Sequence, residues 1–195
     1  HYADYTEKGI PADEKFALDP TEMNPEDWVL TFNLNIIEPT AVLIESIVSG
    51  LKDKGDFSIN DIIESLEKDE EAKEETRDAA IALFKAARTW GIFVESTKDA
   101  TQVKDLINAG TTSVLDLSVY NSVGAFNVRA LAISLLTRKI FNQRMDSRKK
   151  EEIKSIAQGL NYLTSEVKKE DPLVWLFIDE AHEFLPLKGK TLATD

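Results

Sequence analysis

The spacing of apolar residues predicts helices in the first half of the chain. Within residues 39–52 apolar side chains recur at intervals of three and four, which is the period of one buried helix face. Asn24 and Pro25 predict the start of an earlier, shorter helix, because asparagine caps helix N-termini and proline fits the first helical turn. By the same criteria, further helices are predicted from Ser58 or Asn60, over 76–90 and over 99–108.

A change of period after residue 110 predicts two strands. Residues 111–118 are a β-rich run between a glycine and a turn-prone stretch, and residues 173–178 are six consecutive apolar residues. Between them the pattern predicts a helix over 127–145, apolar all round in its first half, and a second, amphipathic helix that Pro172 ends. Strand, helix and strand in that order are typical of a parallel βαβ unit.

The order of these elements predicts an α/β fold in three parts. We expect residues 1–38 to form an irregular lead-in with one short helix, and residues 39–108 to form an all-helical insertion. Residues 109–195 are expected to hold a helix-rich, partial parallel sheet that includes the last predicted strand. The sequence begins with His1 rather than methionine and ends without an evident helix cap. We therefore expect it to be a piece of a longer protein.

Composition narrows the classes of function. The 35 acidic and 23 basic residues give a net charge of −12, so the surface as a whole repels phosphate backbones, and any contact with DNA must be local. The chain has no cysteine and two histidines, which excludes disulfides and thiolate metal sites and nearly excludes a histidine-built zinc site. No apolar stretch approaches the roughly 18 residues of a membrane span, so we expect a cytoplasmic protein.

Two adjacent carboxylates offer catalytic chemistry. Asp179 and Glu180 directly follow the apolar run 173–178, which would place them at the carboxyl edge of a parallel sheet, where open α/β sheets bind ligands. In P-loop NTPases the first such acid helps to hold the Mg²⁺ that bridges the β- and γ-phosphates of ATP, and we assign this role to Asp179. Glu180 would orient and deprotonate the attacking water. The alternative is that the pair only caps the following helix.

The letters Asp179-Glu180-Ala181-His182 also spell the DEAH box of a large helicase class. Such an enzyme would carry a Ser-Ala-Thr element shortly downstream, and none occurs up to Asp195. A DEAH-type helicase core remains one alternative. A non-enzymatic helical interaction module, in which the acid pair is a degenerate remnant, is another.

Several stretches around the acid pair resemble one ATPase family. Residues 183–186 and 189–195, the run 110–118 and the helix through 136–141 are similar in kind and order to archaeal ATPases of the HerA branch of the FtsK–HerA superfamily. The likeness is loose over the whole chain and good over residues 110–195. It implies part of a P-loop NTPase.

The resemblance further implies a motor. Members of this family are ring-forming, usually hexameric ATPases that use ATP and Mg²⁺ to pump double-stranded DNA through a central channel, and the HerA branch works with a nuclease, NurA. By this resemblance the chain belongs to an ATP-hydrolysing DNA translocase or helicase, with Asp179 and Glu180 as its Walker B acids.

The sequence departs from the family in its phosphate-binding loop. The pattern Gly-x-x-x-x-Gly-Lys-Ser/Thr does not occur. Gly189-Lys190-Thr191 has its last three letters, but Phe184 stands where the first glycine belongs, and the stretch follows the acid pair instead of preceding it. We therefore expect the phosphate loop, and the family's arginine-containing segment, to lie outside this sequence. The 195 residues alone are expected to bind neither ATP nor Mg²⁺.

A basic stretch over residues 138–150 allows two interpretations. Six basic residues against Asp146 leave it a net charge of +5. In the first interpretation, Arg138 or Arg144 reaches the nucleotide of a neighbouring subunit, or the stretch contacts DNA phosphates. In the second, which we favour, these side chains pair with the acidic helices of the insertion, where residues 61–78 have a net charge of −6.

Overall fold

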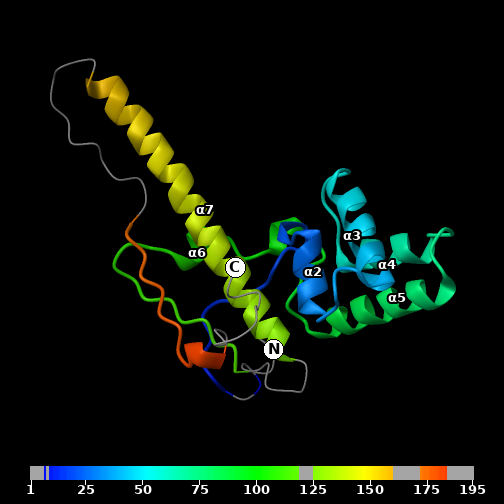
Figure 1. Cartoon of the computed structure of the whole chain (residues 1–195). Coiled ribbons are helices and arrows are strands. Elements are labelled where there is room, and N and C mark those ends of the chain that lie inside the picture. Colours follow the sequence, from blue (N-terminus) through cyan, green and yellow to red (C-terminus); the bar gives the residue numbers. More distant parts are fainter. Residues whose placement is uncertain (1–6, 8, 119–124, 160–171, 184–195) are drawn as a thin grey trace.

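Helices make up the regular structure of the part of the chain that the computed structural model describes, namely residues 7, 9–118, 125–159 and 172–183. In chain order the elements are the 3-10 turn η1 (Pro20–Glu22), α2 (Pro25–Thr31), α3 (Pro39–Lys52), α4 (Ile59–Glu67), α5 (Glu74–Thr89), the 3-10 turn η2 (Thr97–Asp99), α6 (Val103–Leu106), α7 (Ala125–Gly159) and the 3-10 turn η3 (Ala181–Glu183). Helices α2 to α5 pack into one body, and α7 extends away from it (Figure 1).

The expected α/β fold is wrong for these residues, which are all-helical. Neither 111–118 nor 173–178 forms a strand, and so no parallel sheet is present in the described ranges. The β-type pairing found there is one isolated parallel bridge between Leu18 and Phe93, which join the lead-in to the segment after α5.

Within the described ranges, neither predicted strand has a neighbour to pair with. A run of apolar residues indicates burial, but a strand forms only when a second backbone supplies the other half of the hydrogen-bond ladder. No such ladder joins either run to another segment within the ranges that are described. Several of their apolar side chains are accordingly open to solvent, with exposed fractions of 86% for Val114, 75% for Trp175 and 85% for Phe177. Leu117 is half-buried and packs against the hydrophobic core.

The long helix α7 replaces the two helices predicted between the strands. It continues from Ala125 to Gly159 through the point near residue 146 where we expected a break. The intervening residues, Asp146 to Glu152, contain no glycine or proline that would stop a helix, and most of them are good helix formers. The rest of the second predicted helix, residues 160–171, lies outside the described residues.

Trp28 lies at the centre of the helical body. It is fully buried, and its ring centroid lies 5.0 Å from that of Phe84 on α5 and 5.1 Å from that of Phe93. Phe32 completes the cluster with a stacked contact to Trp28 at 5.8 Å. The same core also includes the first part of α7, through buried residues such as Leu131. One hydrophobic core thus joins the lead-in, the helices of residues 39–108 and the start of α7.

A capping box begins α4. The Ser58 hydroxyl and backbone N–H both donate to Asp61 Oδ2 at 2.7 Å, and the Asp61 N–H donates back to Ser58 Oγ at 3.3 Å. The hydrogen bond from the Ser58 side chain, and then that from its backbone, lower the pKa of Asp61 below 3.8, with burial acting weakly in the opposite direction.

Among the described helices, none combines the length and the apolar character that crossing a membrane requires.

Candidate functional site

Asp179 and Glu180 lie in a turn between residues 172–178 and η3. Glu180 adopts a left-handed backbone conformation with φ of 50°, and its N–H donates to Asp179 Oδ1 at 2.9 Å. This local bond holds the two acids in a compact turn. Both residues are exposed, and the Glu180 side chain is 66% accessible.

The Glu180 side chain contacts His182, two residues further along the chain. The Nδ1 of His182 lies 3.1 Å from Glu180 Oε2, and the His182 side chain is 77% exposed. A contact this open to water contributes little to stability. Residues 179–182, which spell the DEAH box, therefore form one exposed turn in which both carboxylates are accessible to solvent.

The expectation that the acid pair lies at the edge of a parallel sheet is wrong here, because the described residues contain no sheet. No cluster of three or more His, Cys, Asp or Glu side chains suited to a metal ion occurs among them. If Asp179 and Glu180 bind Mg²⁺, phosphate oxygens and water would have to complete its coordination shell, which is how Mg²⁺ is commonly held in nucleotide sites. Their roles in binding Mg²⁺ and activating water remain predictions.

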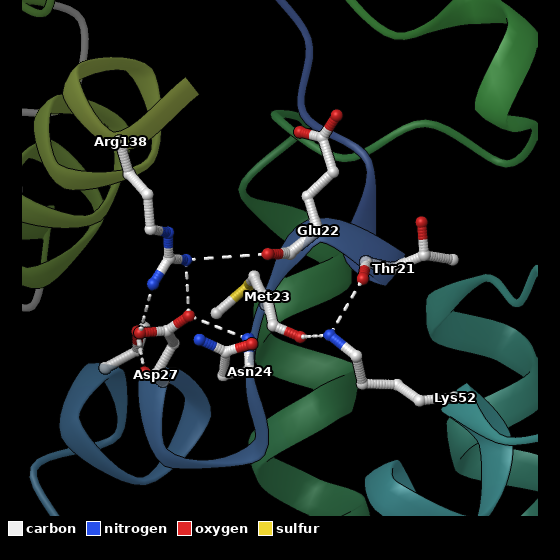
Figure 2. A network of polar contacts seen from close by, with 8 residues as sticks. Thr21, Glu22, Met23, Asn24, Asp27, Lys52 and Arg138 are labelled. Carbon is white, nitrogen blue, oxygen red and sulfur yellow. Dashed lines mark hydrogen bonds and ion pairs between the residues drawn. The ribbon is translucent and has the colours of Figure 1, made fainter. Parts of the chain in front are cut away.

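A second group of charged residues lies where α7 crosses the start of α2. Arg138 on α7 reaches Asp27 on α2 with both guanidinium nitrogens, Nη2 to Oδ2 at 2.6 Å and Nη1 to Oδ1 at 3.3 Å (Figure 2). The Asp27 side chain is 12% exposed and that of Arg138 is 33% exposed. A bidentate pair of this kind is strong and directional. It ties α7 to the helical body.

Asp27 has a second role in the same place. Its Oδ2 also accepts a hydrogen bond from the Asn24 N–H at 2.7 Å, which completes the N-terminal turn of α2. In the sequence Asp27 follows closely on the predicted helix start at Asn24 and Pro25, but nothing indicated that Arg138, 111 positions further along the chain, is its partner. Sequence reasoning therefore missed Asp27 as the residue that anchors α7.

Two more bases of the stretch 138–150 are paired. Lys139 Nζ lies 2.7 Å from Glu22 Oε1 on η1, and Arg144 Nη1 lies 3.3 Å from Glu151 Oε1 on α7 itself. The interpretation that these side chains pair with the acidic helices of residues 39–108 is wrong for Arg138, Lys139 and Arg144, whose partners belong to the lead-in and to α7 itself.

Lys52, at the end of α3, closes the same network from the other side. Its Nζ donates to two backbone carbonyls, those of Thr21 at 3.1 Å and Met23 at 2.8 Å (Figure 2). These bonds fix the position of the ammonium group without cancelling its charge. Sequence reasoning did not single out Lys52.

An open groove of about 780 Å³ runs along this junction. One wall is α7, from Leu135 to Lys150, and the other is formed by η1, the end of α3 and Val103 on α6. The groove is lined by charged and amide side chains along most of its length. It is separate in sequence from Asp179 and Glu180, neither of which lines it.

Comparison with known proteins found no matching family model, no matching curated protein and no matching solved structure.

Proposed function

We propose that Asp179 and Glu180 are the acid pair of an ATP-hydrolysing motor similar to the HerA ATPases. The observation that carries the proposal is that two adjacent, accessible carboxylates follow directly on an uncovered apolar run. Apolar side chains such as Trp175 and Phe177 are costly to leave in water, so this run favours contact with further polypeptide. That contact would enclose the acids next to it and give them the water-poor surroundings in which charge chemistry is effective.

Within this proposal the two acids have separate tasks. Asp179 would hold a Mg²⁺ ion on the phosphates of ATP, and Glu180 would accept a proton from the attacking water. The phosphates need a cradle of backbone N–H groups, which the 195 residues do not encode as a Gly-x-x-x-x-Gly-Lys-Ser/Thr loop. The proposal therefore requires a phosphate-binding loop from polypeptide outside this sequence.

The cellular role proposed here follows from the HerA resemblance. The complete motor would form a ring, with six subunits as in most of the family, and would move double-stranded DNA through its channel in the cytoplasm. A nuclease of the NurA kind would be its partner. Because the chain as a whole carries a charge of −12, DNA contact would require a local basic surface.

Three measurements test this function. The 195-residue chain is expected to give no micromolar binding of Mg-ATP in calorimetric titration. In the natural gene product that contains these residues, Glu180→Gln is expected to retain ATP binding and lower turnover at least about 100-fold, the usual contribution of a general base. Asp179→Ala is expected to weaken the dependence on Mg²⁺. Glu75→Gln makes the same chemical change as Glu180→Gln at an exposed position of α5 and serves as the control.

The competing hypothesis, a helical interaction module, gives the opposite result. If the gene product hydrolyses ATP and both acid variants retain the wild-type rate, the pair has no catalytic role. A gene product that hydrolyses no ATP at all would refute the motor outright.

A further inference from the structure

The groove along α7 has the volume of a small-molecule site, although it is open to solvent. Its volume of about 780 Å³ lies within the roughly 300–1,000 Å³ of known ligand pockets. Besides Leu135, the polar residues of α7 enter its lining at helical spacing: Arg138 and Lys139, Asn142 and Gln143, Asp146 and Ser147, then Lys150.

Two of the four cations that line the groove are already neutralised. Arg138 is paired with Asp27 and Lys139 with Glu22, so both serve to hold the walls together. The remaining cations are Lys52 and Lys150, which come from two different helices.

Lys52 and Lys150 retain binding capacity. An ammonium group has three N–H donors, and Lys52 uses two of them on backbone carbonyls, which leaves one donor and the full charge. Lys150 is exposed and forms no ion pair with another residue in the described part of the chain. Against these two charges the lining offers one further acid, Asp146. The groove is therefore locally positive on a protein whose net charge is −12.

We infer that this groove binds a small, multiply charged anion with phosphate-type oxygens. Lys52 and Lys150 would form ion pairs with the anion. The side-chain amides of Asn142 and Gln143 would donate further hydrogen bonds to its oxygens. The affinity is limited by Asp146 and by the openness of the groove to water, so we expect dissociation constants weaker than micromolar. Neither Asp179 nor Glu180 lines the groove, so anion binding here is independent of the proposed ATPase function.

Calorimetric titration of the 195-residue chain with inorganic tripolyphosphate at low salt tests the site. Lys150→Gln is expected to weaken binding about three- to tenfold, as for loss of one charge-assisted contact. Lys149→Gln removes the same charge from the neighbouring exposed position, which does not line the groove, and is expected to have little effect.

A second pair of variants tests for a gain, which misfolding would not produce. Asp146→Asn is expected to tighten tripolyphosphate binding severalfold, whereas Glu152→Gln, an exposed acid of α7 outside the groove, is expected to leave it unchanged. No measurable binding, or equal effects of Lys150→Gln and Lys149→Gln, would overturn the inference. The same titration is repeated with a short DNA duplex in place of tripolyphosphate. If the duplex binds in a way that depends on Lys150 and tripolyphosphate does not bind, the groove is a nucleic-acid surface and the inference of a small-anion site is overturned. Glu180→Gln is expected to leave tripolyphosphate binding unchanged.

Discussion

The pair between Asp27 and Arg138 is the contact whose removal tests most directly how α7 is held. Three variants form a double-mutant cycle: Asp27→Ala, Arg138→Met and the two together. Methionine keeps much of the apolar stem of Arg138, so this substitution removes mainly the guanidinium group. The quantity of interest is the coupling free energy, which isolates the interaction between the two side chains from the other effects of each substitution.

The magnitudes follow from burial and hydrogen bonding. Removing one partner of a buried ion pair costs about 3–5 kcal/mol, but Arg138 is one-third exposed and Asp27 keeps the Asn24 N–H, so we expect about 2 kcal/mol for Arg138→Met. Asp27→Ala also removes the acceptor that completes the first turn of α2, worth about 1 kcal/mol, which brings its expected cost to about 3 kcal/mol. The expected coupling free energy is about 1.5 kcal/mol.

Urea denaturation followed by far-UV circular dichroism measures these free energies, because the described fold is helical. The pair of Glu64 and Lys68 on the surface of α4 is the matched control: its side chains are 60% and 72% exposed, and its coupling is expected to stay below about 0.5 kcal/mol. If the two single-variant costs simply add in the double variant, the pair between α2 and α7 contributes nothing specific, and our account of the α7 anchor fails.

Two further predictions concern the core and the response to acid. Phe84→Ala is expected to cost about 3–5 kcal/mol of unfolding free energy because Phe84 is fully buried beside Trp28, whereas Phe141→Ala, at a side chain that is 62% exposed, is expected to cost less than about 0.5 kcal/mol; urea midpoints that moved equally would contradict the assigned core. Because the folded-state pKa of Asp61 is lowered, its capping contribution is present above pH 3.8 and is lost as the pH falls through the folded pKa. Ser58→Ala is expected to raise this pKa toward 3.8, measured by NMR titration of the carboxyl carbon, and an unchanged titration curve would show that the capping box is not formed in solution.

The helices that could be predicted are those whose start is encoded locally. Asn24 and Pro25 gave the first residue of α2, and the apolar spacing gave α3 with the bounds that the structure has, Pro39–Lys52. Helix α5 was predicted two residues late at its start, and one residue late at its end, which is Thr89. Proline occupies the first position of α2 and of α3, and each of the three helices buries part of its surface, so neighbouring residues contain the information.

What could not be predicted depends on distant partners. The run 173–178 has the composition of a buried strand, but composition does not specify the backbone with which a strand pairs. The partner of Arg138 could not be predicted for the same reason. The charge pattern suggested that Arg138 pairs with an acidic residue, but it did not show that this residue is Asp27. For Asp179 and Glu180 the chemistry of the side chains could be inferred from the residue types alone, and the structure adds the exposed turn in which they lie.

Among the described residues, the first part of α7 is attached to the helical body, and the rest of this long helix extends beyond the attachment. The 35 residues of α7 span about 52 Å, and the 21 residues beyond Arg138 account for about 30 Å of this length. At that radius, a tilt of about 10° at the Asp27 contact would carry Gly159 through roughly 5 Å. A small change of angle where α7 meets α2 therefore becomes a displacement of several ångströms at the far end of the helix.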